Sequence, residues 1–169
     1  MSDLSALTHR HWSIHVLVEL LRGPEKKPGP LARRLDVSRQ TLLSTLQALA
    51  EQGLVEGPPN EPALTRKGER VAERGEALLS ALQKAGAADQ RKWALPLLHA
   101  LGHKPHRFGE LKAALPSATP RAISMALKDL VEAGLVDRRV VDGFPPRTEY
   151  GLHAKARGLA PLLDQVAKL

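Results

Sequence analysis

Two stretches of the sequence have the residue types that recognise nucleic acid. Residues 120–133 and 39–52 each place aliphatic side chains on one side of an expected helix and polar side chains on the other. An α-helix fits the major groove of DNA, where Arg pairs with guanine and Gln with adenine. The predicted DNA-binding residues on these polar sides are Thr119, Arg121, Ser124 and Lys128 in the second half, and Arg39, Gln40 and Ser44 in the first, with Met125, Thr45 and Gln47 beside them.

A basic β-hairpin is predicted after the second of these helices. Residues 135–141 and 148–152 have the pattern of strands, and Asp142-Gly143 marks the turn between them. A basic hairpin beside a DNA-reading helix follows the phosphate backbone or enters the minor groove. The basic side chains expected to do so are Arg138, Arg139 and Arg147.

Further phosphate contacts are expected from the helix that precedes each DNA-reading helix. His106 and Arg107 are predicted to start this helix in the second half, and Arg33 and Arg34 to lie late in its counterpart. The first hairpin is shorter: residues 54–65 contain two Glu residues and no Lys or Arg. We therefore expect the second half to be the stronger reader of DNA.

The overall charge agrees with a polyanion as partner. The 169-residue chain has a net charge of +7, and residues 86–169 hold 13 Lys/Arg against 8 Asp/Glu, or 13 − 8 = +5. Residues 1–85 hold 12 against 10, or 12 − 10 = +2. The chain has no Cys, which excludes disulfides and thiolate chemistry. With neither an apolar run of about 18 residues nor a secretory signal, a cytoplasmic location is expected.

Metal and catalytic sites are not expected. His11 and His15 have helical i, i+4 spacing, and His99, His103 and His106 lie close in sequence, but no carboxylate or Cys accompanies them at ligand spacing. Glu110, Asp129 and Glu149 have no nucleophile, phosphate loop or metal ligands around them that would make them acid–base catalysts. The sequence therefore predicts a protein without cofactor, metal or enzymatic activity.

An internal repeat suggests how these residues are positioned. Trp12 and Trp93 lie 81 residues apart, several Leu pairs share that offset, and the triplet Gly53-Leu54-Val55 recurs as Gly134-Leu135-Val136. We interpret this as two units, residues 1–85 and 86–169, with a boundary near residues 84–89. Both Trp residues are expected in the core.

Each unit is predicted to have three helices, a hairpin and a closing helix. Ser38 and Thr119 are expected to cap the third helices, Gly53 and Gly134 to end them, and Gly102 to end the first helix of the second unit. This order predicts a mainly α fold with small β-hairpin wings, in two tandem winged helix-turn-helix units. The expected helices are 12–21, 30–35, 39–52 and 67–83, then 90–101, 108–115, 120–133 and 154–167.

Residues 91–163 resemble the HxlR-type winged-helix regulators, a branch near the MarR type. The resemblance depends on five stretches of sequence. These are residues 91–93 (RKW), 107–111 (RFGEL), 115–121 (LPSATPR), 127–136 (LKDLVEAGLV) and 145–150 (PPRTEY). The first half is similar only through the repeat.

The resemblance implies a transcriptional regulator that binds double-stranded operator DNA. Members of this family usually have one winged helix per chain and dimerise through terminal helices, so this chain is expected to act as a monomeric pseudo-dimer or as a homodimer. Some members sense oxidants through an N-terminal Cys, which is missing here. The alternative is a tandem winged-helix protein-interaction module, such as a subunit of a chromosome-segregation complex, and the short acidic first wing fits that function better than the second wing does.

Overall fold

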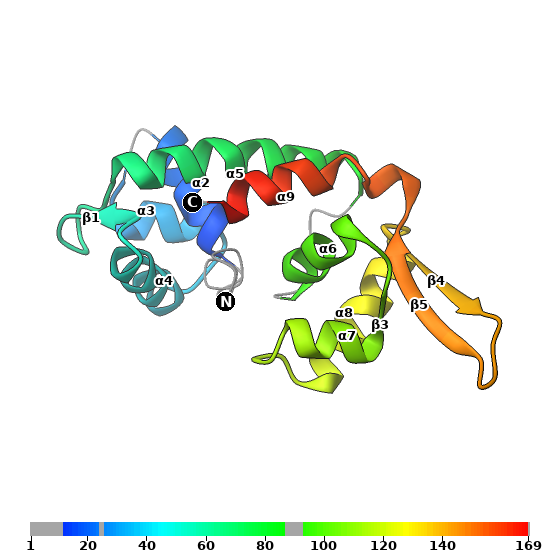
Figure 1. Cartoon of the computed structure of the whole chain (residues 1–169). Coiled ribbons are helices and arrows are strands. Elements are labelled where there is room, and N and C mark those ends of the chain that lie inside the picture. The colour runs from blue at the N-terminus through cyan, green and yellow to red at the C-terminus, as the bar shows by residue number, and fades with distance from the viewer. Residues whose placement is uncertain (1–11, 24–25, 87–92, 169) are drawn as a thin grey trace.

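The described residues of the first half form three short helices, a small hairpin and one long helix (Figure 1). The computed structural model describes residues 12–23, 26–86 and 93–168. The elements of this half are α2 (Ser13–Arg22), α3 (Pro28–Arg34), α4 (Arg39–Glu51), β1 (Val55–Glu56), β2 (Ala63–Leu64) and α5 (Arg66–Lys84).

The second half has the same order with a longer hairpin and one additional strand. Its antiparallel sheet has the strand order β3-β5-β4. The elements are α6 (Ala94–His103), β3 (His106–Arg107), α7 (Phe108–Ala114), α8 (Pro120–Glu132), β4 (Val136–Val141), β5 (Arg147–Leu152), the 3₁₀ turn η1 (Ala154–Ala156) and α9 (Leu159–Ala167). The mainly helical fold with two small hairpins was predicted and is confirmed.

The third helix of each half begins and ends as predicted. The Ser38 hydroxyl accepts a hydrogen bond from the Thr41 N–H at 3.0 Å, and the Thr119 hydroxyl accepts one from the Ala122 N–H at 3.2 Å. Just beyond each helix, Gly53 and Gly134 both have φ +67°, the left-handed conformation that glycine adopts without a Cβ penalty. These caps fix both ends of α4 and α8.

Each hairpin is fastened to its half by the same backbone hydrogen bond. The Thr65 N–H donates to the Leu54 carbonyl at 3.1 Å, and the His153 N–H donates to the Leu135 carbonyl at 2.9 Å. Leu54 and Leu135 are 81 residues apart, as are the two capping residues. The returning strand therefore ends against the residue that follows Gly53 or Gly134 in each half.

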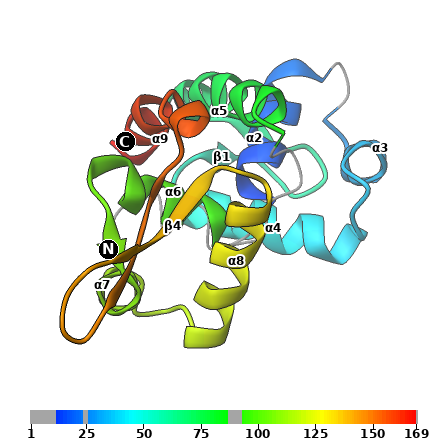
Figure 2. The same ribbon diagram turned by 90° about the vertical axis from the view of Figure 1, so that its right-hand side faces the viewer.

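Helices α5 and α9 join the two halves. They lie side by side in Figure 1, and the Arg74 guanidinium on α5 donates to the Gln165 carbonyl on α9 at 2.7 Å. Helices α4 and α8 lie on the other side of the molecule, below α5 in both views (Figures 1 and 2). The α5–α9 pair thus holds the two third helices on a common side.

The core is formed by the aliphatic stripes that the sequence indicates. Leu97, Leu98 and Ile123 are fully buried, and each such side chain contributes about 1.5–3 kcal/mol through its removal from water. Trp93 is buried at 9% exposure, and Trp12 is half-buried against the same core, as predicted. Leu46, Leu49, Leu127, Leu130, Leu159 and Leu163 are buried with them.

Three predicted boundaries are wrong. Gly102 does not end the first helix, since α6 continues to His103; a Cβ at Gly102 would lie 3.0 Å from the Ala160 Cβ, so close packing explains this glycine. The predicted helix 154–167 is interrupted, because η1 precedes α9. His106 and Arg107 form β3, where they pair with Tyr150 and Glu149 of β5; of the two, only Arg107 takes part in the start of α7, as its N-cap. The predicted unit boundary at 84–89 and the start of helix 90–101 fall partly on residues 87–92, which lie outside the described residues.

Candidate nucleic-acid interface

Helix α8 presents a polar flank to solvent. Arg121, Ser124 and Lys128 are exposed, whereas Ile123 and Leu127 on the opposite side are buried. This division follows from the helical period, which places residues three and four apart on one face. The exposed flank was predicted and is confirmed; Thr119 and Met125 are exposed on it as well. Lys128 is 3.7 Å from Glu132, an exposed pair that holds the ammonium only weakly.

The wing β4–β5 divides its arginines between two faces. Strand pairing places Arg139 opposite Glu149 and Arg138 opposite Tyr150. Because successive side chains of a strand point to opposite faces, Arg139 shares a face with Arg147, and Arg138 occupies the other. All three arginines are exposed, but the wing is not uniformly basic on either face.

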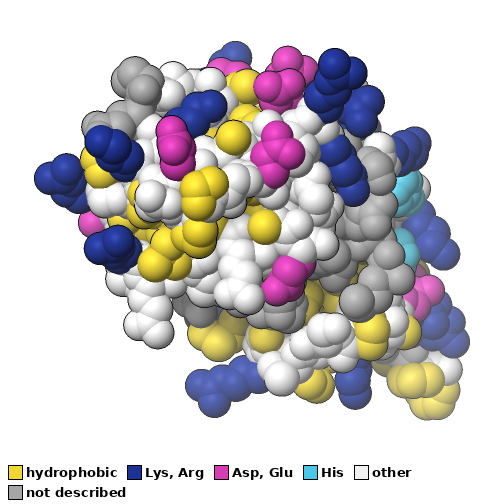
Figure 3. All heavy atoms as spheres, turned by 90° about the vertical axis from the view of Figure 1, so that its left-hand side faces the viewer, with side chains coloured by type: hydrophobic (Ala, Val, Ile, Leu, Met, Phe, Trp, Pro, Cys, Tyr) yellow, Lys and Arg dark blue, Asp and Glu magenta, His cyan; other side chains and the backbone are white. Residues whose placement is uncertain are grey.

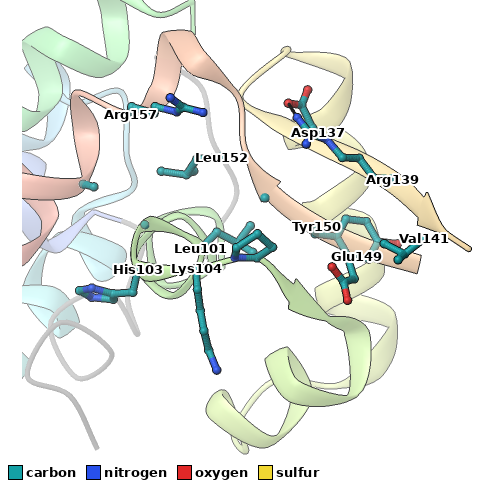
Figure 4. A pocket seen from close by; sticks show the side chains of 14 residues that line it. Leu101, His103, Lys104, Asp137, Arg139, Val141, Glu149, Tyr150, Leu152 and Arg157 are labelled. Atoms are coloured by element: carbon teal, nitrogen blue, oxygen red, sulfur yellow. Dashed lines mark hydrogen bonds and ion pairs between the residues drawn. The ribbon is translucent and has the colours of Figure 1, made fainter. Parts of the chain in front are cut away.

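Carboxylates form ion pairs with two arginines on or beside the wing. The Arg107 Nε lies 3.5 Å from Glu149, and the Arg139 Nη2 lies 3.4 Å from Asp137. Arg139, Asp137 and Glu149 line a hollow of about 510 Å³ between the end of α6 and the wing (Figure 4). Arg139 and Arg107 are therefore already paired with neighbouring acids, and their positive charge is only partly free.

Glu110 fixes the start of α7. Its carboxylate accepts a hydrogen bond from the Arg107 N–H at 2.6 Å, and this bond lowers the pKa of Glu110 below its ordinary value, with smaller contributions from nearby positive charges. Loss of hydration opposes the change, with an effect smaller than that of the hydrogen bond but larger than that of each nearby charge. Glu110 is thus a capping residue of α7.

The tip of the wing exposes apolar side chains that were not singled out from the sequence. Phe144 is fully exposed, Val140 is 64% exposed and Val141 is 40% exposed. The signal available in the sequence was Phe144 itself, a large apolar residue among turn-forming neighbours.

Helix α4 offers fewer polar side chains than predicted. Arg39 and Gln40 are exposed, but Ser44 is half-buried and its hydroxyl donates to the Thr41 carbonyl at 3.0 Å. Thr45 was expected on the outer side and is buried, with its hydroxyl bonded to the same carbonyl at 2.8 Å. Position 45 lies on the Leu42–Leu49 side of the helix, which faces the core. The Thr45 hydroxyl therefore forms its hydrogen bond with the helix backbone.

An apolar groove lies between α4 and the first hairpin. Its volume is about 690 Å³, and Figure 3 shows hydrophobic side chains gathered on this end of the molecule. The apolar lining of the groove includes Leu43, Leu46, Val55, Pro58, Pro59 and Pro62.

Of the two predicted phosphate contacts in α3, Arg33 is exposed, and Arg34 lies 2.9 Å from the Glu19 carboxylate.

A cluster of three potential metal ligands corrects the sequence analysis. His99 and His103 of α6 both reach the same carboxylate oxygen of Asp164 on α9, at 2.9 and 3.3 Å. A carboxylate therefore accompanies these histidines, although it is 65 residues away in sequence from His99. His106 is not part of the cluster, since its Nδ1 lies 2.8 Å from the Lys104 carbonyl. His11 of the other predicted pair lies outside the described residues.

Three helices followed by a β-hairpin, with the third helix exposed beside the hairpin, define a winged helix-turn-helix protein. The HxlR-like helix-turn-helix model matches residues 89–169, and the HVO_A0261 N-terminal domain model matches residues 1–87. The chain belongs to the HxlR-like helix-turn-helix family, which its second half represents. The halves match two different models, so these comparisons do not extend the HxlR-like assignment to the first half.

Similar proteins each match about half of the chain. The uncharacterized HTH-type transcriptional regulator YdzF of Bacillus subtilis is 41% identical over 78 residues, covering 46% of this chain and 72% of YdzF. YvaP of the same organism is 36% identical, covering 51% of this chain and 80% of YvaP. A solved structure assigned to the MarR family, from Porphyromonas gingivalis W83, is 30% identical with a TM-score of 0.45, covering 53% of this chain and 83% of that one.

The described residues contain no helix that is both long enough and apolar enough to pass through a lipid bilayer.

Proposed function

We propose that this protein is a transcriptional regulator that binds specific double-stranded DNA through α8 and the wing β4–β5. The observation that carries the proposal is the exposed polar flank of α8 beside an arginine-bearing hairpin. The relatives YdzF and YvaP, which match 78 and 86 residues of this chain, are named as HTH-type transcriptional regulators. The net charge of +5 on residues 86–169 favours the approach of this half to DNA.

The exposed residues divide into base-reading and phosphate-binding roles. We assign base edges to Arg121, Ser124 and Lys128, because the outer side of a third helix faces the floor of the major groove. Thr119 lies at the N-terminus of α8, where free N–H groups attract phosphate. The wing residues Arg138, Arg139 and Arg147, together with Arg107, are assigned to the phosphate backbone.

The first half is proposed to be a second winged-helix unit, residues 1–85, with residues 86–169 as the other. The matching caps and the matching bonds from Thr65 and His153 support this division. Arg39, Gln40 and Ser44 would then form a weaker second reading helix. Since α5 and α9 already pack within one chain, we propose a monomer that acts as a pseudo-dimer.

A band-shift titration with duplexes selected from genomic DNA tests the DNA-binding function. Arg121→Ala should lower the preference for the selected sequence by about 1–3 kcal/mol. Arg147→Ala should weaken binding to all duplexes alike and reduce the slope of log K against log[salt] by about 0.9. The loss of affinity relative to the parent protein should therefore shrink about 3.5-fold between 50 and 200 mM salt. Arg70→Ala removes the same charge from α5, on the far side from α8, and should leave binding unchanged. Equal, sequence-blind losses from Arg121→Ala and Arg147→Ala would refute the division of roles.

A second candidate function is protein interaction through the first half. The apolar groove beside α4 favours it, because a DNA-reading helix is normally flanked by polar and basic surface. If the titration detects no selected duplex above background, this second function replaces the first.

A further inference from the structure

We propose that His99, His103 and Asp164 form a binding site for one divalent transition-metal ion, with Zn²⁺ as its representative. The site goes beyond DNA binding and does not depend on it. Imidazole nitrogen and carboxylate oxygen are ligands that Zn²⁺ accepts in tetrahedral sites, where three protein ligands leave the fourth position open.

The backbone places both imidazoles on one side of α6. Residues four apart lie one above the other on a helix, and pairs of histidines at this spacing are suited to a common metal ion. The two rings stand edge to face with centroids 5.2 Å apart. Their Nε2 atoms converge on Oδ1 of Asp164, which α9 supplies from across the α6–α9 contact.

The distances suit a tetrahedral ion. Ligands at about 2.0–2.2 Å from Zn²⁺ lie about 3.3–3.5 Å from one another. The nitrogen–oxygen distances in the cluster are 2.9 and 3.3 Å, and all three ligand atoms lie within 4.8 Å of one another. An ion therefore needs adjustments of well under 1 Å in these two distances.

The cluster is anchored on one side and open on the other. His99 is 20% exposed and Asp164 29% exposed, so the packing of α6 on α9 restricts both. His103 is 58% exposed and gives an ion a route from solvent. A bound ion would strengthen the contact between α6 and α9, and α9 in turn packs along α5.

Isothermal titration of the untagged full-length chain with Zn²⁺ tests the proposal, with thermal unfolding as a second measurement. We expect saturable binding of one ion per chain, and a melting temperature raised by about 5–10 °C when free Zn²⁺ is a hundredfold above its Kd. Mg²⁺, which requires oxygen ligands, should do neither.

Variants locate the ion. His99→Asn, His103→Asn and Asp164→Asn should each weaken Zn²⁺ binding by at least about tenfold, because each removes a direct ligand. His103→Asn tests this most directly, since the residue is more than half exposed and its loss leaves the packing intact. His106→Asn and His153→Asn remove an imidazole outside the cluster and should bind as the parent does; Asn at position 153 also keeps the helix-capping function.

Two results would overturn the proposal: no saturable Zn²⁺ binding to the parent chain, or binding that the three cluster variants retain in full. Either would leave the cluster as a hydrogen-bonded contact between α6 and α9. No DNA is present in this experiment, so its failure is distinct from a failure of the proposed regulator function.

Discussion

Gly68, in the first turn of α5, is packed too closely to accept any side chain. A Cβ there would lie 1.9 Å from the Leu54 carbonyl oxygen, whereas ordinary contacts begin near 3.4 Å, so the two groups must separate by about 3.4 − 1.9 = 1.5 Å. That carbonyl is also the acceptor for the Thr65 N–H that fastens the first hairpin. Gly68→Ala therefore displaces backbone rather than a flexible side chain, and we expect it to cost at least about 3 kcal/mol.

Thermal unfolding followed by circular dichroism measures this cost. For a chain of this size, 3 kcal/mol lowers the melting temperature by about 6–12 °C. Gly109→Ala is the matched control: Gly109 lies in the first turn of α7, is not followed by proline, and has nothing within 4 Å of its Cβ position. There the change should stabilise the protein by up to about 1 kcal/mol, because alanine favours helix. A Gly68→Ala protein that melts within 2 °C of the parent would refute the close approach of α5 to the first hairpin.

Two further predictions concern charges in the second half. Glu149→Gln removes the acid that faces Arg107 and Arg139, so DNA should bind more tightly and the salt slope should steepen by up to about one; unchanged or weaker binding in the band shift, with Glu73→Gln on α5 as control, would contradict this. Glu110 has a lowered pKa in the folded protein, so its charge stabilises the fold above the pKa of the unfolded chain, and this contribution disappears as the pH falls through the lowered value. Urea unfolding of the parent and of Glu110→Gln should therefore differ at pH 7 and converge in acid, and a constant difference would show that the capping charge is unimportant.

Local rules in the sequence were sufficient for both ends of α4 and α8. Ser38 and Thr119 cap because a hydroxyl at this position satisfies a free N–H, and Gly53 and Gly134 end the helices because they accept positive φ. Such signals act over three or four residues and need no knowledge of tertiary contacts.

Features that depend on distant contacts were missed. The strand character of His106 and Arg107 comes from pairing with β5, more than 40 residues later, and a two-residue strand has no periodicity to detect. The burial of Thr45 required knowing which side of α4 meets the core. Asp164 joined His99 and His103 only because α9 folds back on α6.

In the candidate interface, too, some features follow from local sequence and others depend on distant contacts. That Arg121 and Lys128 share an exposed flank follows from helical spacing alone. That Glu149 lies between Arg107 and Arg139 follows from strand register, which the lengths of the turn and loops set. The amount of free positive charge on the wing was therefore overestimated from composition.

The packing of α5 on α9 fixes the distance between α4 and α8. If α4 and α8 both enter the major groove, the separation of their two recognition sequences is set by the α5–α9 contact rather than by a flexible linker. B-DNA turns once in about 10–10.5 base pairs, so five inserted base pairs would rotate one sequence to the opposite side of the duplex. Such an insertion would leave only one of the two helices able to engage at a time.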